Sequence, residues 1–190
     1  QIFARGRRLL LEDAIVESPA GVTNATLSVS GGELVAKRSF LGWSQILDGV
    51  LAVFENTRAF SIMAENSRLS GSLVLHPSMA NFRQLVLQNG SRGEFDELTL
   101  FASYGEFLVN GSVLSVEDTK LTQGAQIAIY SQNGSQVDVD VAAVFESVDG
   151  QWKQVQAPTP VNGPTSANSG KSGQVSGCLL YTSPSPRDGL

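Results

Sequence analysis

Apolar and polar residues alternate in short runs through the first 156 residues of the chain. The run 137–141 reads Val-Asp-Val-Asp-Val, which would place its valines on one side of a strand and its aspartates on the other. Helical spacing of apolar residues is nearly absent, and Gly, Asn, Asp and Ser fill the gaps between the runs. The alternation predicts an all-β fold, with strands expected at 9–16, 25–29, 34–40, 46–54, 73–76, 85–87, 95–101, 113–116, 127–130 and 137–145.

Glycines recur ahead of these runs at a nearly constant spacing. They are Gly32, Gly49, Gly71, Gly90, Gly111 and Gly134, separated by steps of 17, 22, 19, 21 and 23 residues. A repeat of about 20 residues is typical of a parallel β-solenoid, in which each coil buries its apolar side chains against the coils next to it. The series predicts about six coils. A loop can lengthen in one coil without disturbing the stacked strands, which accounts for the uneven steps.

Asparagine accompanies the later glycines of this series. The tripeptide Asn-Gly-Ser begins at Asn89, Asn110 and Asn133, and Asn66 falls one step earlier. In stacked coils these amides would bond to one another and form a side-chain ladder. The pattern resembles the asparagine ladders of right-handed parallel β-helix proteins such as pectate lyases, and the resemblance implies a β-helix of the surface or adhesin kind. The expected structural ladder comprises Asn66, Asn89, Asn110, Asn133, Gly71, Gly90, Gly111 and Gly134.

Asn-Gly also has a second structural interpretation, a two-residue hairpin turn, which would give an antiparallel β-sandwich. The runs on either side of Asn133 would pair acceptably in such a hairpin. After Asn89, however, no apolar partner appears until Phe95. The regular step from coil to coil favours the solenoid over the sandwich.

Four asparagines stand in the acceptor pattern for N-glycosylation, in which Ser or Thr follows two residues later. They are Asn24, Asn89, Asn110 and Asn133. Glycosylation would place these turns on the surface of a secreted protein, and it is compatible with either fold. We therefore expect an extracellular or cell-surface location.

Composition changes abruptly after Gln156. Residues 1–156 are expected to form the solenoid domain, while residues 157–177 are rich in Pro, Gly, Ser and Thr and read as a linker, because they hold too few apolar side chains to offset the entropy of ordering. Residues 178–188, CLLYTSPSPRD, resemble a translated transposase sequencing adapter, and we expect 178–190 to be an artefactual tail on a fragment of a longer protein. That tail holds the one cysteine, Cys178.

Charge and hydropathy exclude two classes of partner. The formal net charge is −5, so the chain has no electrostatic case for binding nucleic acid. Arg5, Arg7 and Arg8 form a basic cluster, but Glu12 and Asp13 follow closely and indicate a solvated face. No run of about 18 apolar residues is present, so we expect no membrane span in this chain.

Catalytic chemistry has few candidate residues. His76 is the one histidine, no second histidine is available for a metal pair, and no cysteine nucleophile remains once the tail is set aside. We expect no catalytic residue, metal or cofactor site. Carboxylate pairs could cleave a polysaccharide if adjacent coils brought them together, but each is explained equally well as a solvated face. These pairs are Asp96 with Glu97, Glu117 with Asp118, and Asp138 with Asp140.

Aromatic residues are spread through the expected coils, and we expect most of them to fill the core. They include Trp43, Phe54, Phe60, Phe101, Tyr104, Phe107, Tyr130, Phe145 and Trp152.

The expected function is a non-catalytic structural or adhesive module that presents a solenoid face to glycans or surface proteins. A polysaccharide lyase or glycoside hydrolase on a β-helix is the main alternative. A sugar-binding β-sandwich is the second.

Overall fold

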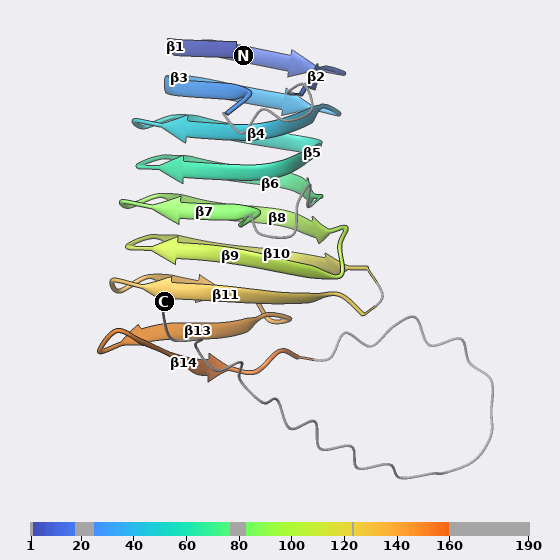
Figure 1. Ribbon diagram of the computed structural model, residues 1–190. Coiled ribbons are helices and arrows are strands. Elements are labelled where there is room, and N and C mark those ends of the chain that lie inside the picture. The colour runs from blue at the N-terminus through green and yellow to red at the C-terminus, as the bar shows by residue number, and fades with distance from the viewer. Residues whose placement is uncertain (1, 18–24, 77–82, 123, 160–190) are drawn as a thin grey trace, which may run out of the picture.

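The computed structural model describes residues 2–17, 25–76, 83–122 and 124–159, and within these ranges every element is a β-strand (Figure 1). The strands are β1 (Ile2–Glu12), β2 (Ile15–Val16), β3 (Leu27–Lys37), β4 (Phe40–Leu47), β5 (Leu51–Glu65), β6 (Arg68–Leu75), β7 (Leu85–Gln88), β8 (Arg92–Leu100), β9 (Tyr104–Asn110), β10 (Val113–Leu121), β11 (Gln126–Gln132), β12 (Gln136–Asp138), β13 (Ala143–Val148) and β14 (Gln151–Gln156).

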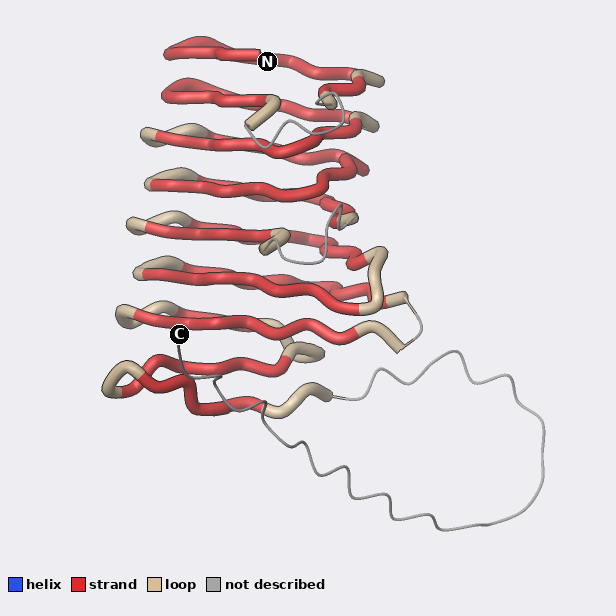
Figure 2. The backbone as a smooth tube through the Cα atoms, in the orientation of Figure 1, coloured by secondary structure: helices blue, strands red, loops and turns tan. Residues whose placement is uncertain are grey.

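The strands wind into coils of about 22 residues, stacked in about six turns as a β-solenoid. The strands from β1 to β13 pair in parallel with strands of the coils next to them, for example β8 with both β6 and β10. The coils follow one another in chain order from β1 to the β13–β14 end (Figures 1 and 2). The expected all-β solenoid is confirmed.

The antiparallel sandwich is overturned by the strand pairing. Every ladder in the described part of the chain is parallel except that of β13 with β14. The Asn133–Gly134 turn shows the reason. It leads from β11, which pairs with β9, into β12, which pairs with β10. The turn therefore carries the chain on to another face of the coil and does not fold a strand back on itself.

The core is a set of apolar columns that run along the solenoid. Leu34, Ala52 and Leu69 are register neighbours in successive coils, and each is at most 1% exposed. Burying one Leu side chain contributes about 1.5–3 kcal/mol, so repeated burial in a column accounts for much of the stability. Gly93 occupies the next position and makes room for a larger neighbour, because a Cβ there would lie 2.9 Å from the Phe95 ring.

Two expected strands end earlier than the alternation suggests. The run 46–54 is divided by Asp48 and Gly49, whose φ angles of 60° and 82° turn the chain between β4 and β5. The run 137–145 is divided as well, because β12 ends at Asp138 and β13 begins at Ala143. Between them the Ala142 amide donates to the Val139 carbonyl at 3.4 Å, which closes a turn.

The glycines of the repeat do not all share one column. Gly90 and Gly111 stack in the same turn, where the Gly90 amide donates to the Gly111 carbonyl at 2.9 Å, and Gly134 lies at the corresponding turn after β11. Gly71 lies instead within β6, opposite Phe54 and Phe95. The equivalent turn in its coil is made by Asn66, which takes a φ of 48° without a following glycine.

The two ends of the solenoid are built differently. At the far end β14 folds back against β13, and the Gln156 side-chain amide donates to the carbonyls of Val139 and Ala142 at 2.9 and 3.3 Å. At the near end β1 pairs with β3. Residues 160–190, which include most of the expected linker and all of the expected tail, lie outside the described residues. No helix in the described ranges is long and apolar enough to cross a membrane.

Candidate ligand-binding corner

One corner of the solenoid varies in length from coil to coil. In the coil of β4 a single residue, Gly42, separates Leu41 from Trp43. In the coil before it, the register partners of those two residues are Val16 and Thr26, and nine residues separate them. Position 42 has no room for a side chain, because a Cβ there would lie 2.8 Å from Oγ1 of Thr26 in the preceding coil.

The next two coils repeat the contrast. In β5 only Phe60 separates Ala59 from Ser61. In the following coil, residues 76–83 separate the register partners Leu75 and Gln84. Two coils whose corner is a single residue thus lie between two coils with longer corner segments. We call the single-residue corner the minimal corner and the longer segments insertions. In solenoids such insertions map to loops that often flank the binding face. Residues 18–24 and 77–82 of the insertions lie outside the described residues.

Aromatic rings gather on the outer surface of this corner. Phe40 and Phe60 meet edge to face with ring centroids 4.8 Å apart, and His76 meets Phe101 at 4.8 Å. Phe60, His76 and Phe101 occupy successive coils, since the His76 amide donates to the Ala59 carbonyl and the Phe101 amide to the Leu75 carbonyl. We call these four residues, Phe40, Phe60, His76 and Phe101, the aromatic corner.

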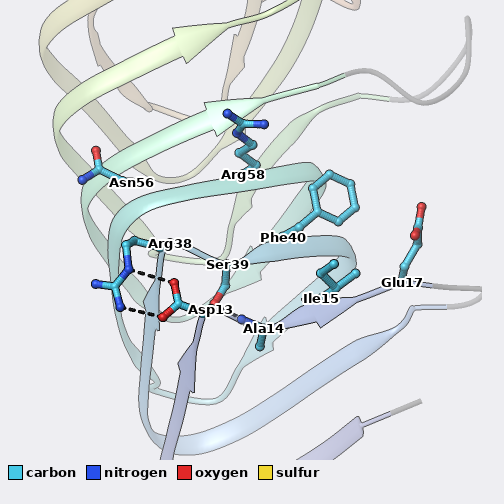
Figure 3. Close-up of a pocket in the computed structure, with 9 residues that line it drawn as sticks. All are labelled: Asp13, Ala14, Ile15, Glu17, Arg38, Ser39, Phe40, Asn56 and Arg58. Atoms are coloured by element: carbon cyan, nitrogen blue, oxygen red, sulfur yellow. Dashed lines mark hydrogen bonds and ion pairs between the residues drawn. The ribbon is translucent and has the colours of Figure 1, made fainter.

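A groove of about 700 Å³ opens beside the aromatic corner (Figure 3). Phe40, Ile15 and Arg58 line it together with Asn56. Figure 3 places the Arg58 side chain beside the Phe40 ring, and the Arg58 guanidinium forms no ion pair or hydrogen bond with any residue the structure describes. Its donors are available to a ligand in the groove.

In another wall of this groove the positive charge of Arg38 is paired with carboxylates. Arg38 donates from Nε and Nη2 to the two carboxylate oxygens of Asp13, at 2.8 Å each, and Nη2 also reaches Glu12 Oε1 at 2.9 Å. The hydrogen bonds from Arg38 hold the pKa of Asp13 below its ordinary value of 3.8. The two arginines of the groove therefore differ: Arg38 is a fixed part of the wall, whereas Arg58 forms no ion pair with the residues that the structure describes.

A second groove, of about 500 Å³, lies on the face formed by the residues of β4 and β5 that follow the minimal corner, such as Trp43 and Met63. Trp43, Met63 and Val86 supply its apolar lining. Arg83 closes one side through an ion pair to Glu106, with Nε 2.8 Å from Oε1. The Arg83 guanidinium also stands 5.8 Å from the centroid of the Tyr130 ring. Both grooves thus flank the short-cornered coils.

The asparagines of the expected ladder lie in successive turns, but they do not all hold the same position. Asn66, Asn89 and Asn133 have positive φ angles of 48°, 55° and 57°, whereas in the turn after β9 the positive φ belongs to Gly111, and Asn110 is the last residue of the strand. Their side chains also bond differently. Asn133 Nδ2 donates to Asn110 Oδ1 at 2.5 Å, which is a ladder bond. Asn89 Nδ2 donates instead to Glu65 Oε1 at 2.6 Å. Of the acceptor asparagines, Asn89 and Asn133 are exposed and Asn110 is half-buried, whereas Asn24 lies outside the described residues.

Two of the carboxylate pairs meet across adjacent coils, where Glu97 and Asp118 are register partners beside Lys120. Glu97 is ion-paired with Lys120, and this contact holds the pKa of Glu97 below its ordinary value. Asp118 lies 3.6 Å from the same ammonium group. Asp138 and Asp140 are exposed. Within the described ranges no group of three or more His, Cys, Asp or Glu side chains is arranged to hold a metal ion.

His76 belongs to the aromatic corner and has no carboxylate partner among the described contacts. Burial lowers its pKa below 6.5, and the positive charge of Arg58 lowers it further. Both effects favour the neutral imidazole. His76 is thus one of the rings of the corner, with its plane tilted by 40° against that of Phe101.

The expectation that most aromatic residues fill the core is wrong. Phe54, Phe95 and Phe107 are fully buried, but Phe101 is 59% exposed and Trp152 is 43% exposed. The reason for this exposure is that side chains along an extended segment alternate between the inner and the outer face, whatever their chemistry. Sequence reasoning also passed over Phe40 and Arg58. The signal that would have found them is the pair of insertions, which only a coil-by-coil register reveals.

No family model, curated protein or solved structure matches this chain.

Proposed function

We propose that this chain is a non-catalytic carbohydrate-binding module of an extracellular or cell-surface protein, and that its stiff solenoid presents the aromatic corner to a glycan. The observation that carries the proposal is the outward column Phe60–His76–Phe101 beside Phe40. Phe40 also lines the groove together with Arg58, whose guanidinium has no ion-pair partner within the described ranges.

Exposed rings of this kind suit the apolar faces of sugars. A Phe side chain left 59% exposed, as Phe101 is, offers apolar surface that a ligand can cover, and covering it would recover stabilisation that folding does not provide. Rings on adjacent coils form a continuous surface that can contact more than one sugar unit of a chain. The scattered single apolar residues of an ordinary surface lack this continuity.

Arg58 supplies the polar part of the recognition. Small-molecule sites combine an apolar lining with a few placed polar groups that set orientation. The guanidinium carries five donors in a fixed plane and accepts no hydrogen bonds, so it suits sugar hydroxyl oxygens or a sugar carboxylate. Asn56, on the same groove, offers both a donor and an acceptor.

The solenoid backbone supports binding because it holds these groups in place beforehand. Each strand of the corner is paired on both sides, as β5 is with β4 and β6. A preorganised surface loses little conformational freedom when a ligand binds. The surface location is supported by the exposed acceptor asparagines Asn89 and Asn133.

The test is binding of the whole chain to an array of immobilised glycans, followed by titration of the best ligand. We expect Phe101→Ala to weaken binding by about tenfold or more, and Arg58→Gln to weaken it as well. Phe3→Ala is the matched control, since Phe3 is 74% exposed but lies on β1, outside the aromatic corner. Absence of binding to every glycan, or an equal loss in the Phe3 variant, would overturn the proposal.

A further inference from the structure

Two turns of the solenoid share one tetrapeptide, Gln-Asn-Gly-Ser, at 88–91 and at 132–135. Their local geometry is also the same. Asn89 and Asn133 are both exposed and have φ angles of 55° and 57°. In each turn the serine Oγ donates to the glutamine carbonyl three residues earlier, at 2.8 Å in the first turn and 2.6 Å in the second. The two turns are therefore a matched pair, and they differ in what the neighbouring coil provides.

The backbone amides of the first turn are bonded to the next coil. The Asn89 amide donates to the Asn110 carbonyl at 3.2 Å, and the Gly90 amide donates to the Gly111 carbonyl at 2.9 Å. The turn after β9 is held in the same way, since the Gly111 amide donates to the Gln132 carbonyl at 3.0 Å. An amide held like this exchanges its proton or reacts only after the hydrogen bond opens.

The second turn lacks this support. No residue in the described ranges accepts a hydrogen bond from the backbone amide of Asn133 or of Gly134. The cause is the course of β13. Its parallel ladder with β11 ends at Glu146, and Val148, two residues further on, pairs with β14 instead. The chain thus enters the β13–β14 hairpin before it can bond to the second turn.

An asparagine that precedes a glycine can lose its side-chain amide without an enzyme. The backbone nitrogen of the glycine loses its proton and attacks Cγ of the asparagine, so that a new N–C bond closes a succinimide ring and ammonia leaves. Water then opens the ring at either carbonyl, which gives aspartate or isoaspartate. Glycine favours the step because it has no Cβ to restrict the backbone. A hydrogen bond from the glycine N–H to another coil opposes it, because that bond must break first.

We propose that Asn133 is a site of spontaneous deamidation, at which the Gly134 nitrogen and water convert the side-chain amide into a carboxylate. The identical tetrapeptide at Asn89 is protected by the coil that follows it. This modification site lies in the turn after β11 and does not depend on glycan binding at the aromatic corner.

Deamidation would change this turn in two ways. The Asn133 Nδ2 group that donates to Asn110 Oδ1 leaves as ammonia, so the bond between the two side chains is lost in its present form. Isoaspartate also adds one carbon to the main chain between β11 and β12. We expect both changes to loosen β12, which pairs with β10 over three residues, and to leave the earlier coils as they are.

The test follows the two matched sites in the whole chain by peptide mapping and mass spectrometry during storage at mildly alkaline pH. The chain is produced in a host without N-glycosylation, so that no glycan blocks either asparagine. We expect Asn133 to deamidate about tenfold faster than Asn89, or more, because the Gly90 amide must first leave its bonded position. Hydrogen exchange should follow the same order, with Gly134 faster than Gly90. In urea, where the coils are lost, the two sites should react at equal rates.

One variant separates backbone protection from side-chain protection. Asn89 Nδ2 donates to Glu65 Oε1 at 2.6 Å, and Glu65→Gln removes the charge from that contact while it leaves the backbone of the turn unaltered. We expect deamidation of Asn89 in this variant to stay within about threefold of its rate in the unaltered chain. Equal rates at the two sites of the folded chain, unequal rates in urea, or a rise at Asn89 to the rate of Asn133 in the Glu65 variant would each overturn the proposal.

Discussion

The side chains of Asn133 and Asn110 are joined across two consecutive coils, with Nδ2 of Asn133 donating to Oδ1 of Asn110 at 2.5 Å. Among the described residues this is the one asparagine-to-asparagine bond of the turn column, since Asn89 bonds to Glu65. Asn133 is exposed, so the bond competes with water. Asn89 and Asn133 therefore serve their turns through a left-handed backbone conformation as well as through their side chains, whereas Asn110 does not take that conformation and Gly111 does.

Substitution at Asn133 separates those two contributions. Asn133 has a φ of 57°, a conformation that Gly adopts freely and Ala does not. Both Asn133→Ala and Asn133→Gly remove the side-chain bond, worth about 0.5–1.5 kcal/mol. We expect Asn133→Ala to lower the free energy of unfolding, measured in urea, by about 1 kcal/mol more than Asn133→Gly does. Equal losses would show that the left-handed turn carries no strain there.

Glycine 71 should tolerate no side chain. Its φ is 97°, and a Cβ would lie 2.1 Å from the backbone oxygen of Phe54. We expect Gly71→Ala to destabilise the fold by more than about 3 kcal/mol, because backbone strain and a clash with a paired strand add together. Gly90→Ala is the control, since Gly90 has a φ of 80° but open space around it. That variant should lose only about 1–2 kcal/mol, and a similar loss for both would contradict the close approach of β5 and β6.

The single histidine allows a direct titration. His76 should show a pKa below 6.5 by NMR, because burial and then the charge of Arg58 disfavour the imidazolium. Removing the charge with Arg58→Gln should raise that pKa but leave it below 6.5, since burial persists. The lowered pKa of His76 also sets the direction in which stability changes with pH. As the pH falls below 6.5 the unfolded chain takes up a proton before the folded one does, so stability declines until the pH passes the lower folded pKa. A pKa of His76 above 6.5 would be inconsistent with its place in the corner.

Two phenylalanines close together in sequence, Phe101 just after β8 and Phe107 within β9, should differ sharply in their effect on stability. Phe107 is fully buried, so Phe107→Ala should cost about 3–5 kcal/mol through lost burial and the cavity it leaves. Phe101 is 59% exposed, and Phe101→Ala should change stability by less than about 1 kcal/mol. Thermal or urea unfolding of both variants measures the contrast. A large loss in the Phe101 variant would mean that this ring serves folding, and its use as a binding test would fail.

The sequence predicted the parallel solenoid from the spacing of glycines and asparagines, yet it misplaced Gly71. A glycine marks any sharp bend, and a coil contains more than one bend. Gly90 serves the turn before β8, whereas Gly71 serves the bend inside the coil of β6. Sequence spacing alone does not distinguish these positions, because insertions elsewhere in the coil keep the total near 22 residues.

By itself the sequence determined the all-β class, the stacking of coils and the apolar columns, because strand alternation and a repeat near 20 residues are local properties of the chain. Tertiary structure decided the candidate site. Phe40, Phe60 and Phe101 come together only because register neighbours in successive coils lie side by side, although they are far apart in sequence. The same register brings Arg38 to Asp13 one coil away, while Arg58 has no ion-pair partner in the part of the chain that the structure describes. Which charges meet depends on how many residues each corner takes up between two strands. The sequence alone does not show where each strand ends and each corner begins, and the stacking of the coils decides it.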